Sequence, residues 1–277
     1  MGATGLYTEL HVLALLLYGG TAAVAAVPFF PSRRQGGTQW PTLVVGIVAA
    51  TVHFAGLVSY AKAFGTLPLL GLAPALASLA FMIALLALAI AGVKRESTIT
   101  LMTVPLVVGL IAIALTVGFG EVEAPSRAGP WFPLHAAASL LGIAALGVAL
   151  VVSGLYIAQF RALKGRKFGA IFQLFPPLED LDRINFVALV SGFPVLTIGI
   201  GLAIATMDRS PEALAERAPH LGWGIFAWVV LGAVAGARAL GLVRARRAAW
   251  ISIIGFVVLS ILFLFVRAFA GTGARFL

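Results

Sequence analysis

The chain has 277 residues, of which 61% are hydrophobic and only 10% are charged, whereas a soluble domain carries roughly a quarter charged residues. The net charge is +9, but the basic residues stand in short clusters between apolar runs, so the chain offers no continuous basic face to a nucleic acid. There is no cysteine, which excludes thiol redox chemistry and thiolate metal ligands. The composition predicts one integral membrane domain over residues 1–277 and no nucleic-acid partner.

Apolar runs long enough to cross a hydrocarbon core of about 30 Å recur from one end of the chain to the other. Breakers divide these runs into eight predicted spans, at residues 9–30, 42–64, 67–93, 99–119, 132–160, 184–206, 222–243 and 250–268. The first run has no basic segment before it, so we do not interpret it as a cleaved signal peptide. The predicted fold is an all-α, polytopic transmembrane helical bundle of about eight helices, surrounded by membrane lipid.

The charges of the connections alternate along the chain. Basic clusters follow the first, third, fifth and seventh spans: Arg33 and Arg34; Lys94 and Arg95; Arg161, Lys164, Arg166 and Lys167; and Arg244, Arg246 and Arg247. In the other loops, acidic residues dilute the few basic ones. The positive-inside rule then places the four clusters in the cytoplasm and both termini outside it. We expect a multi-pass protein of the bacterial cytoplasmic (inner) membrane.

Three segments of the connections and spans carry further predictions. The longest cytoplasmic connection, 161–183, contains prolines and acids that mark a turn and the start of the sixth span. An outer segment, 210–217, has the composition of a brief interfacial helix. Arg238 is the charged residue well inside a span, and it lies close enough to the cytoplasmic end for its side chain to snorkel to the surface.

The four histidines are the main candidates for function. His11, His135 and His220 lie near the outer ends of the first, fifth and seventh spans, and His53 lies near the middle of the second. About 8 residues, or roughly 12 Å of helix, are expected to separate His53 in depth from the other three. An ionisable side chain inside a membrane is costly, so a functional role is the first hypothesis. The alternative for each histidine is an ordinary hydrogen bond to a neighbouring helix, carbonyl or water.

Haem iron suits this set of histidines better than zinc does. The carboxylate nearest a histidine is Glu9, which falls on a different helix face from His11, and there is no HExxH motif. Haem needs only one or two axial imidazoles, an apolar slot and cations for its propionates. Beside His53, the residues one turn away are small enough to admit a flat ring: Ala49, Ala50 and Gly56.

Arginines and tryptophans on the outer side are candidate contacts for the same group. Arg127 and Arg217 lie outside the membrane, where they can meet carboxylates, and Trp131 and Trp223 flank the same face. The alternative for the arginines is ordinary solvation. The alternative for the tryptophans is the aromatic belt at the membrane interface.

Two stretches of the second half carry a resemblance to a known family. Residues 174–201 read LFPPLEDLDRINFVALVSGFPVLTIGIG, and upstream stands WFPLH at 131–135. This pattern, over about 130–268, resembles the cytochrome c assembly family of membrane haem-handling proteins, of the CcsA/CcmC type. The segment 220–228 lacks the aspartate and most aromatics of the family's tryptophan-rich loop, so the chain looks more like the HemX and YpjD-like branch.

The resemblance implies a haem-binding membrane protein that handles or senses haem, in cytochrome c assembly or in the regulation of haem biosynthesis, rather than an enzyme. The implied cofactor is a non-covalent, b-type haem. By resemblance His135 is the external axial ligand and His220 the candidate that faces it. The full set of candidates, with the iron ligands ranked first, is His135, His220, His53, His11, Arg127, Arg217, Trp131 and Trp223.

The implied partners are subunits of cytochrome c assembly, or glutamyl-tRNA reductase through the 161–183 loop. Two alternatives remain open: a transporter of haem or a small molecule, and a structural membrane subunit without a cofactor. The sequence has no nucleophile–base pair or carboxylate dyad that would indicate an enzyme.

Overall fold

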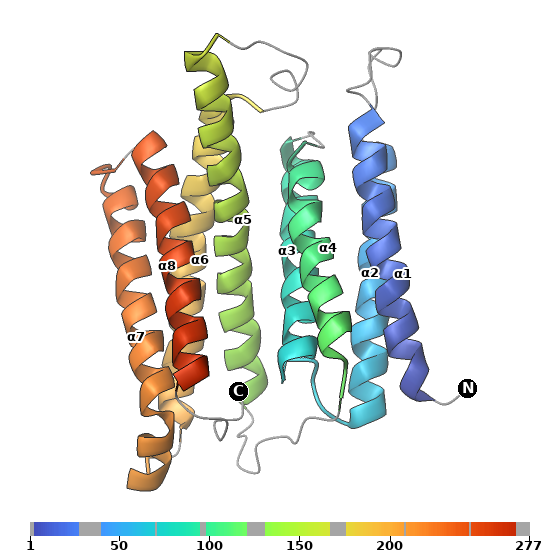
Figure 1. The fold of residues 1–277 in the computed structure, drawn as a ribbon, viewed down its shortest axis with the longest axis vertical. Helices are drawn as coiled ribbons and strands as arrows, with labels where there is room; N and C mark the ends of the chain where they lie inside the picture. Colours follow the sequence, from blue (N-terminus) through green and yellow to red (C-terminus); the bar gives the residue numbers. More distant parts are fainter. Residues whose placement is uncertain are drawn as a thin grey trace. The chain divides into compact units, whose positions relative to one another are not determined.

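The described residues of the chain form eight α-helices (Figure 1). The computed structural model describes residues 3–27, 40–69, 71–94, 98–120, 131–166, 176–207, 209–243 and 245–269. The helices are α1 (Ala3–Ala26), α2 (Trp40–Phe64), α3 (Leu72–Lys94), α4 (Thr98–Val117), α5 (Phe132–Lys164), α6 (Leu178–Thr206), α7 (Pro211–Ala239) and α8 (Ala245–Phe269). The predictions of an all-α fold and of about eight helices are confirmed.

Within the described residues, seven helices, α1 to α7, contain a stretch that is long and apolar enough to cross a membrane. The chain is therefore a multi-pass membrane protein. The predicted eighth span, 250–268, coincides with α8, but its side chains from residue 259 onward lie outside the described residues. The orientation of the termini and the single membrane domain over 1–277 stay predictions.

Two expectations about helix boundaries are wrong. The segment 210–217 is not a separate interfacial helix, because it forms the first turns of α7, which begins at Pro211. Proline fits the first turn of a helix, where its missing N–H has no intrahelical partner to lose. The connection between the fifth and sixth spans is shorter than 161–183, since α5 runs to Lys164 and α6 begins at Leu178. Residues 167–175 of that connection lie outside the described residues.

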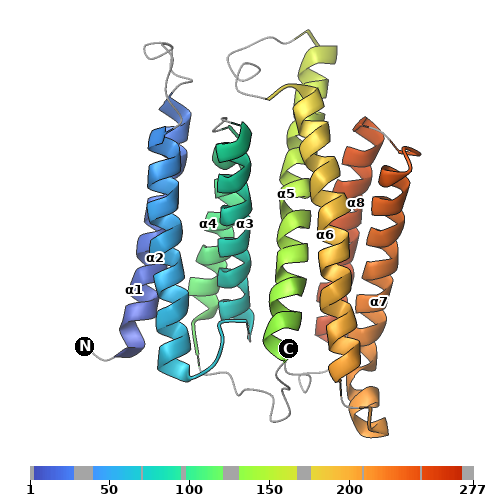
Figure 2. The same ribbon diagram turned by 180° about the vertical axis from the view of Figure 1, so that it is seen from behind.

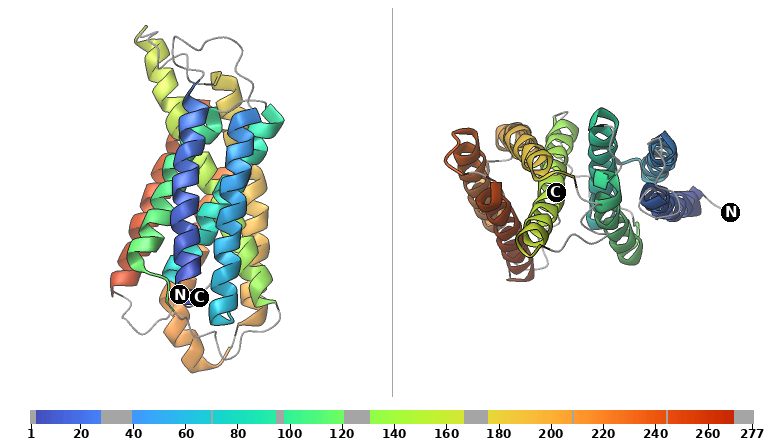
Figure 3. Two further views of the ribbon diagram at one scale, coloured as in Figure 1. Left: turned by 90° about the vertical axis from the view of Figure 1, so that its right-hand side faces the viewer. Right: turned by 90° about the horizontal axis from the view of Figure 1, so that it is seen from above.

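Residues 1–126 and 162–176 form one compact unit, in which α1 to α4 make a four-helix bundle. In this first unit α1 packs against α2 and α4, and α3 packs against the same two helices (Figure 3). The buried face of α1 follows the spacing of three and four residues that brings side chains to one side of a helix: Tyr7, His11, Ala14, Tyr18, Thr21 and Ala25. Many of the residues that line the bundle are alanines, and small side chains let membrane helices approach closely.

Residues 127–161 and 177–277 form the second unit, which holds α5 to α8. Glycines bring α5 and α6 together, and the two helices run side by side (Figure 2). A Cβ atom added at Gly142 would lie 2.9 Å from the backbone of Leu196, and one added at Gly192 would lie 2.8 Å from Cβ of Ala145. Because these contacts leave no space for a side chain, glycine at both positions permits the close pairing.

The remaining helices of the second unit pack through aromatic side chains. The rings of Phe193 in α6 and Trp228 in α7 stack with centroids 5.7 Å apart. Near one end of α5, the Arg161 guanidinium lies 5.5 Å above the ring of Trp250 in α8, and Arg246 of α8 lies 5.1 Å above the ring of Phe160. These cation–π contacts join α5 to α8.

Candidate functional site

His135 is held in a fixed orientation near the start of α5. Its Nδ1 lies 2.7 Å from the carbonyl oxygen of Gly199 in α6, and the hydroxyl of Ser139 lies 3.5 Å from the same nitrogen. A carbonyl can only accept, so Nδ1 carries the proton and donates it. The lone pair of the imidazole is then on Nε2, which is the arrangement of a histidine that binds a metal through Nε2.

Glycine at position 199 makes this hydrogen bond possible. A Cβ atom added there would collide with the Ser139 hydroxyl and would lie 2.8 Å from the backbone nitrogen of Ser139. The carbonyl of Gly199 is within reach of His135 because α6 touches the backbone of α5 at this point. Two residues earlier, the Thr197 hydroxyl donates to the carbonyl of Phe193 and accepts from Trp228 Nε1. The GFPVLTIG segment, residues 192–199, therefore forms the packing surface that orients His135.

The structure leaves the predicted partner of His135 undecided. The backbone of His220 belongs to α7, while its side chain and that of Arg217 lie outside the described residues. Trp228 of α7 bonds to Thr197 of α6, so these two residues lie at about the same height along the two helices. Counted from that height at about 1.5 Å per residue, the backbone of His220 lies roughly 9 Å farther toward the start of α7 than Gly199 does. The pairing of His135 with His220 across a haem stays a prediction.

The other outer candidates are placed only in part. Arg127 lies within 121–130, outside the described residues. Trp131 is 57% exposed, as expected for either a haem contact or an aromatic belt. Trp223 is half-buried in α7. Their roles stay predictions.

The first unit brings His11 and His53 together. Their ring centroids lie 5.3 Å apart with the planes at 79°, and both side chains are 0% exposed. The expected difference in depth between them is wrong, because α1 begins at Ala3 rather than at residue 9 and so places His11 about two turns inside the helix. Glu9 is exposed while His11 is buried, which confirms that the two lie on different faces.

Hydrogen bonds satisfy only one nitrogen of each of these rings. Nδ1 of His11 lies 2.6 Å from the carbonyl oxygen of Tyr7, and the Tyr18 hydroxyl lies 3.4 Å from Nδ1 of His53. Nε2 of His11 and Nε2 of His53 are both buried without a hydrogen-bond partner. A buried polar atom without a partner is unusual and requires an explanation.

The slot predicted beside His53 is filled by protein. A Cβ atom added at Gly56 would lie 2.9 Å from the imidazole of His11, so the space that glycine leaves is occupied by that ring. Phe119 stands 4.5 Å from the His11 ring, and Phe81 stands 5.6 Å from the His53 ring, measured between centroids. A cavity next to Tyr18 measures about 10 Å³, which is enough for a water molecule at most. The pair as it stands does not fit a porphyrin between its rings.

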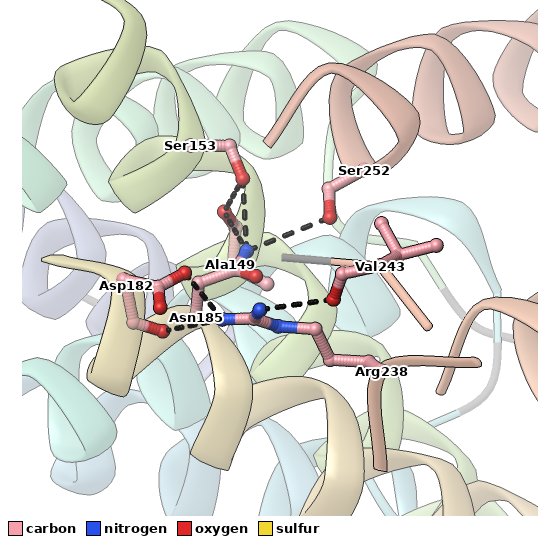
Figure 4. A network of polar contacts seen from close by, with 7 residues as sticks. All are labelled: Ala149, Ser153, Asp182, Asn185, Arg238, Val243 and Ser252. Carbon is pink, nitrogen blue, oxygen red and sulfur yellow. Dashed lines mark hydrogen bonds and ion pairs between the residues drawn. The ribbon is translucent and has the colours of Figure 1, made fainter. Parts of the chain in front are cut away.

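A polar network joins the four helices of the second unit (Figure 4). Asn185 of α6 donates through Nδ2 to the Ser153 hydroxyl at 2.9 Å, to the Ala149 carbonyl at 3.3 Å and to the Ser252 hydroxyl at 3.5 Å. These partners lie on α5 and α8. In the same region Arg238 of α7 forms an ion pair with Asp182 of α6.

The expectation that the Arg238 side chain snorkels to the surface is wrong. Its side chain is 6% exposed, and besides the carboxylate it donates to the main-chain oxygens of Asp182 at 3.1 Å and Val243 at 3.2 Å. The sequence reasoning missed Asp182 as its partner. The available indication was the spacing of Asp182 and Asn185 in LEDLDRIN, three residues apart, which puts both on one helix face.

Comparison with known proteins places the chain in a family. The model of the cytochrome C assembly protein family matches residues 69–272, which is well over half of the chain. The chain belongs to this family. His135, the GFPVLTIG segment and the Asp182–Arg238 pair lie inside the matched region, whereas His11 and His53 precede it.

Individual relatives extend over most of the chain. An uncharacterized 28.8 kDa protein from the nifR3-like 5′ region of Azospirillum brasilense is 26% identical and covers 89% of this chain and 93% of its own. The cytochrome c biogenesis protein CcsA of Microcystis aeruginosa is 24% identical, covering 92% and 90%. Protein HemX of Brevibacillus brevis is 23% identical, covering 70% and 72%. Because proteins named CcsA and HemX both match, the HemX-like branch stays a prediction. No solved structure matches the chain.

Proposed function

We propose that this member of the family is a haem-binding membrane protein that handles or senses haem at the start of α5, in cytochrome c assembly or in the regulation of haem biosynthesis. The observation that supports this proposal is the hydrogen bond between His135 Nδ1 and the Gly199 carbonyl. That bond fixes the ring and its tautomer and leaves the Nε2 lone pair available to iron. The proposed role is binding rather than catalysis.

The chain would hold a non-covalent, b-type haem chiefly through His135. When bound, the haem supplies the iron and a redox-active macrocycle. His220 is proposed as the second imidazole, and Arg127 and Arg217 as cations for the propionates. Trp131 and Trp223 are proposed as aromatic contacts on the same outer side.

An absorption spectrum of the detergent-purified protein, oxidised and reduced, tests the proposal. We expect a Soret band that is lost or strongly weakened in His135→Ala. Gly199→Ala is expected to weaken it as well, because the added methyl group pushes α6 away and breaks the hydrogen bond that orients the imidazole. Gly201→Ala is the matched control, since a Cβ atom at Gly201 meets no atom within 4 Å. A Soret band of full intensity in His135→Ala would overturn the assignment.

The second proposed ligand is tested in the same way. If His220 coordinates the iron, His220→Ala should change the reduced spectrum from six-coordinate to five-coordinate. An unchanged spectrum would remove His220 from the site while leaving His135 in it.

The proposed partners are subunits of cytochrome c assembly, or glutamyl-tRNA reductase at the connection between α5 and α6. The relative named HemX supports considering the regulatory alternative. Co-purification of tagged protein with each candidate, before and after alanine substitution of Lys164 and Arg166, would decide between them. Transport has less support, because Arg238, a charged residue inside the span of α7, is paired with Asp182.

A further inference from the structure

Two arginines lie on aromatic rings where α5 ends and α8 begins, at one end of the second unit (Figure 1). The guanidinium carbon of Arg161 in α5 is 5.5 Å from the ring centroid of Trp250 in α8. That of Arg246 in α8 is 5.1 Å from the ring centroid of Phe160 in α5. Each helix therefore gives one cation and one ring to the same contact. We call these four residues the arginine–aromatic cluster.

The contacts with the rings restrict the two guanidinium groups and leave most of their N–H donors free. A guanidinium carries five N–H donors in one plane, and its attraction to a ring face needs no oxygen partner. Arg161 and Arg246 are both exposed, and among the described residues neither has a carboxylate or carbonyl partner. Asp182, near the start of α6, is paired with Arg238 instead. The cluster therefore presents two held cations to an acceptor from outside the chain.

The surface next to the cluster is apolar. Leu240 and Leu242, in the turn that leads from α7 into α8, are 77% and 72% exposed, and Trp250 is exposed as well. Leucines this exposed are unfavourable in water but not against acyl chains. Cations, a tryptophan and exposed apolar side chains at the end of membrane spans are the arrangement that suits the boundary between headgroups and acyl chains.

We propose that the arginine–aromatic cluster binds the phosphate group of an anionic phospholipid from the surrounding bilayer. Arg161 and Arg246 donate to the phosphate oxygens, for which the planar guanidinium fork is well suited. Trp250 and Phe160 hold the two forks in place. The acyl chains lie along the exposed apolar surface, and the exposed cation Arg247 adds to the attraction for a negative headgroup.

A lipid fits this surface better than a free anion does. A soluble phosphate ester would use the two arginines but would leave the exposed leucines in water. The site is also separate from the two proposed above: it shares no residue with the haem site at His135, and the proposed contacts with partner proteins use Lys164 and Arg166.

Native mass spectrometry of the full-length protein released from detergent tests this proposal. The protein is titrated with phosphatidylglycerol or, as the neutral comparison, with phosphatidylcholine. We expect one phosphatidylglycerol to bind at least fivefold more tightly than phosphatidylcholine. The double variant Arg161→Gln with Arg246→Gln should lose this preference.

The matched control is the double variant Lys164→Gln with Arg183→Gln. It removes the same two charges from exposed positions of α5 and α6 that have no aromatic contact among the described residues. Phosphatidylglycerol should bind to it within twofold of the wild-type affinity. An equal loss in both double variants would mean that any basic residue at this end attracts the lipid, and it would overturn the cluster as a site.

Two further measurements distinguish the held guanidinium forks from charge alone and the lipid from a soluble anion. Arg161→Lys with Arg246→Lys keeps both charges but loses the forks, so the affinity should fall at least threefold. Unchanged affinity would overturn the proposed role of the forks. With the wild-type protein, which needs no variant to fold, an excess of glycerol 3-phosphate should leave the bound lipid in place. Displacement of the lipid would assign the cluster to a soluble phosphate ester.

The remaining outcomes separate this proposal from the proposed function. Equal affinities for phosphatidylglycerol and phosphatidylcholine overturn the lipid site. The Soret band expected for the wild-type protein should keep its intensity in Arg161→Gln with Arg246→Gln. Its loss there would give the two cations to the haem propionates and overturn the lipid site as well. None of these results changes the test of His135.

Discussion

Two polar clusters of this protein differ in how many hydrogen bonds they make between helices. The network of the second unit, around Asn185 and the Asp182–Arg238 pair, joins α5, α6, α7 and α8 through several hydrogen bonds and an ion pair, although Asn185 Oδ1 and Arg238 Nε have no partner. The histidine pair of the first unit is fully buried and is joined between helices by the contact of the Tyr18 hydroxyl with His53 Nδ1, while Nε2 of His11 and Nε2 of His53 have no partner.

The difference indicates two different uses of polar side chains. A network with several hydrogen bonds between helices fixes how they meet, and its loss leaves buried groups without the partners they had, so substitutions there should destabilise the fold. A histidine pair with two unpartnered nitrogens and one long hydrogen bond between helices contributes less, so apolar substitutions that leave no new unpartnered group there should be neutral or stabilising. The sign of the stability change therefore separates the two clusters.

The largest effect is expected from Asp182→Asn. Arg238 would remain buried with its charge uncompensated, and breaking such a pair costs about 3 kcal/mol, at the lower end for buried pairs because Asp182 is 33% exposed. The midpoint of thermal unfolding in detergent should fall clearly. Arg183→Gln, at the next and exposed position of α6, is the control and should change little. A small effect of Asp182→Asn would show that the ion pair does not hold α6 and α7 together.

A second expected loss is that of Gly199→Ala. The added methyl group would overlap the backbone of Ser139, and overpacking of this kind costs about 1–3 kcal/mol. The unfolding midpoint and the orientation of His135 should both be affected. Gly201→Ala should be neutral or slightly stabilising, because alanine is the better helix former at an open position. Equal effects of the two substitutions would contradict the close contact between α5 and α6.

Asn185→Ala should destabilise the protein by about 1–2 kcal/mol, since it removes the donor shared by α5 and α8. Ser191→Ala is a useful comparison in the same helix, because the Ser191 hydroxyl is exposed and bonds only to its own helix. Denaturant unfolding of the two variants would measure the difference between their free energies of unfolding. If both variants unfold alike, the network in Figure 4 contributes nothing specific.

The smallest effect, with the opposite sign, is expected from the double substitution His53→Leu with Tyr18→Phe. It removes the unpartnered Nε2 together with the Tyr18 hydroxyl that His53 Nδ1 contacts, and it keeps apolar side chains in the core, so the free energy of unfolding should stay level or rise by about 1 kcal/mol. The comparison is made without added metal or haem. A loss of more than about 1 kcal/mol would mean that the histidine is structural, and the contrast between the two clusters would disappear.

The helices could be predicted from the sequence because their apolar runs are long and separated by clear breakers. The ends of the helices were harder to predict. The start of α1 at Ala3 depends on the packing of Tyr7 and His11 within the bundle, and the apolar run at 9–30 does not reveal this packing. That shift alone concealed the meeting of His11 and His53. Similarly, the ion pair of Arg238 required knowing that α7 packs on α6.

The candidate site at His135 was only partly predictable. The resemblance singled out this histidine and the GFPVLTIG segment, but it gave no reason why one should depend on the other. The reason is a tertiary contact: Gly199 lets its carbonyl reach the imidazole. Contacts between helices far apart in sequence leave no local pattern, so only the structure could supply this link.

The length of α5 has a consequence for the setting of His135. The helix has 33 residues and is about 50 Å long, whereas the hydrocarbon core of a bilayer is about 30 Å thick. Along its axis His135 and Arg161 are about 39 Å apart. If the Arg161–Trp250 contact rests among the lipid headgroups of one leaflet, the imidazole stands among those of the other. Its access to water, and with it the exchange of any ligand, should then vary with bilayer thickness through hydrophobic mismatch.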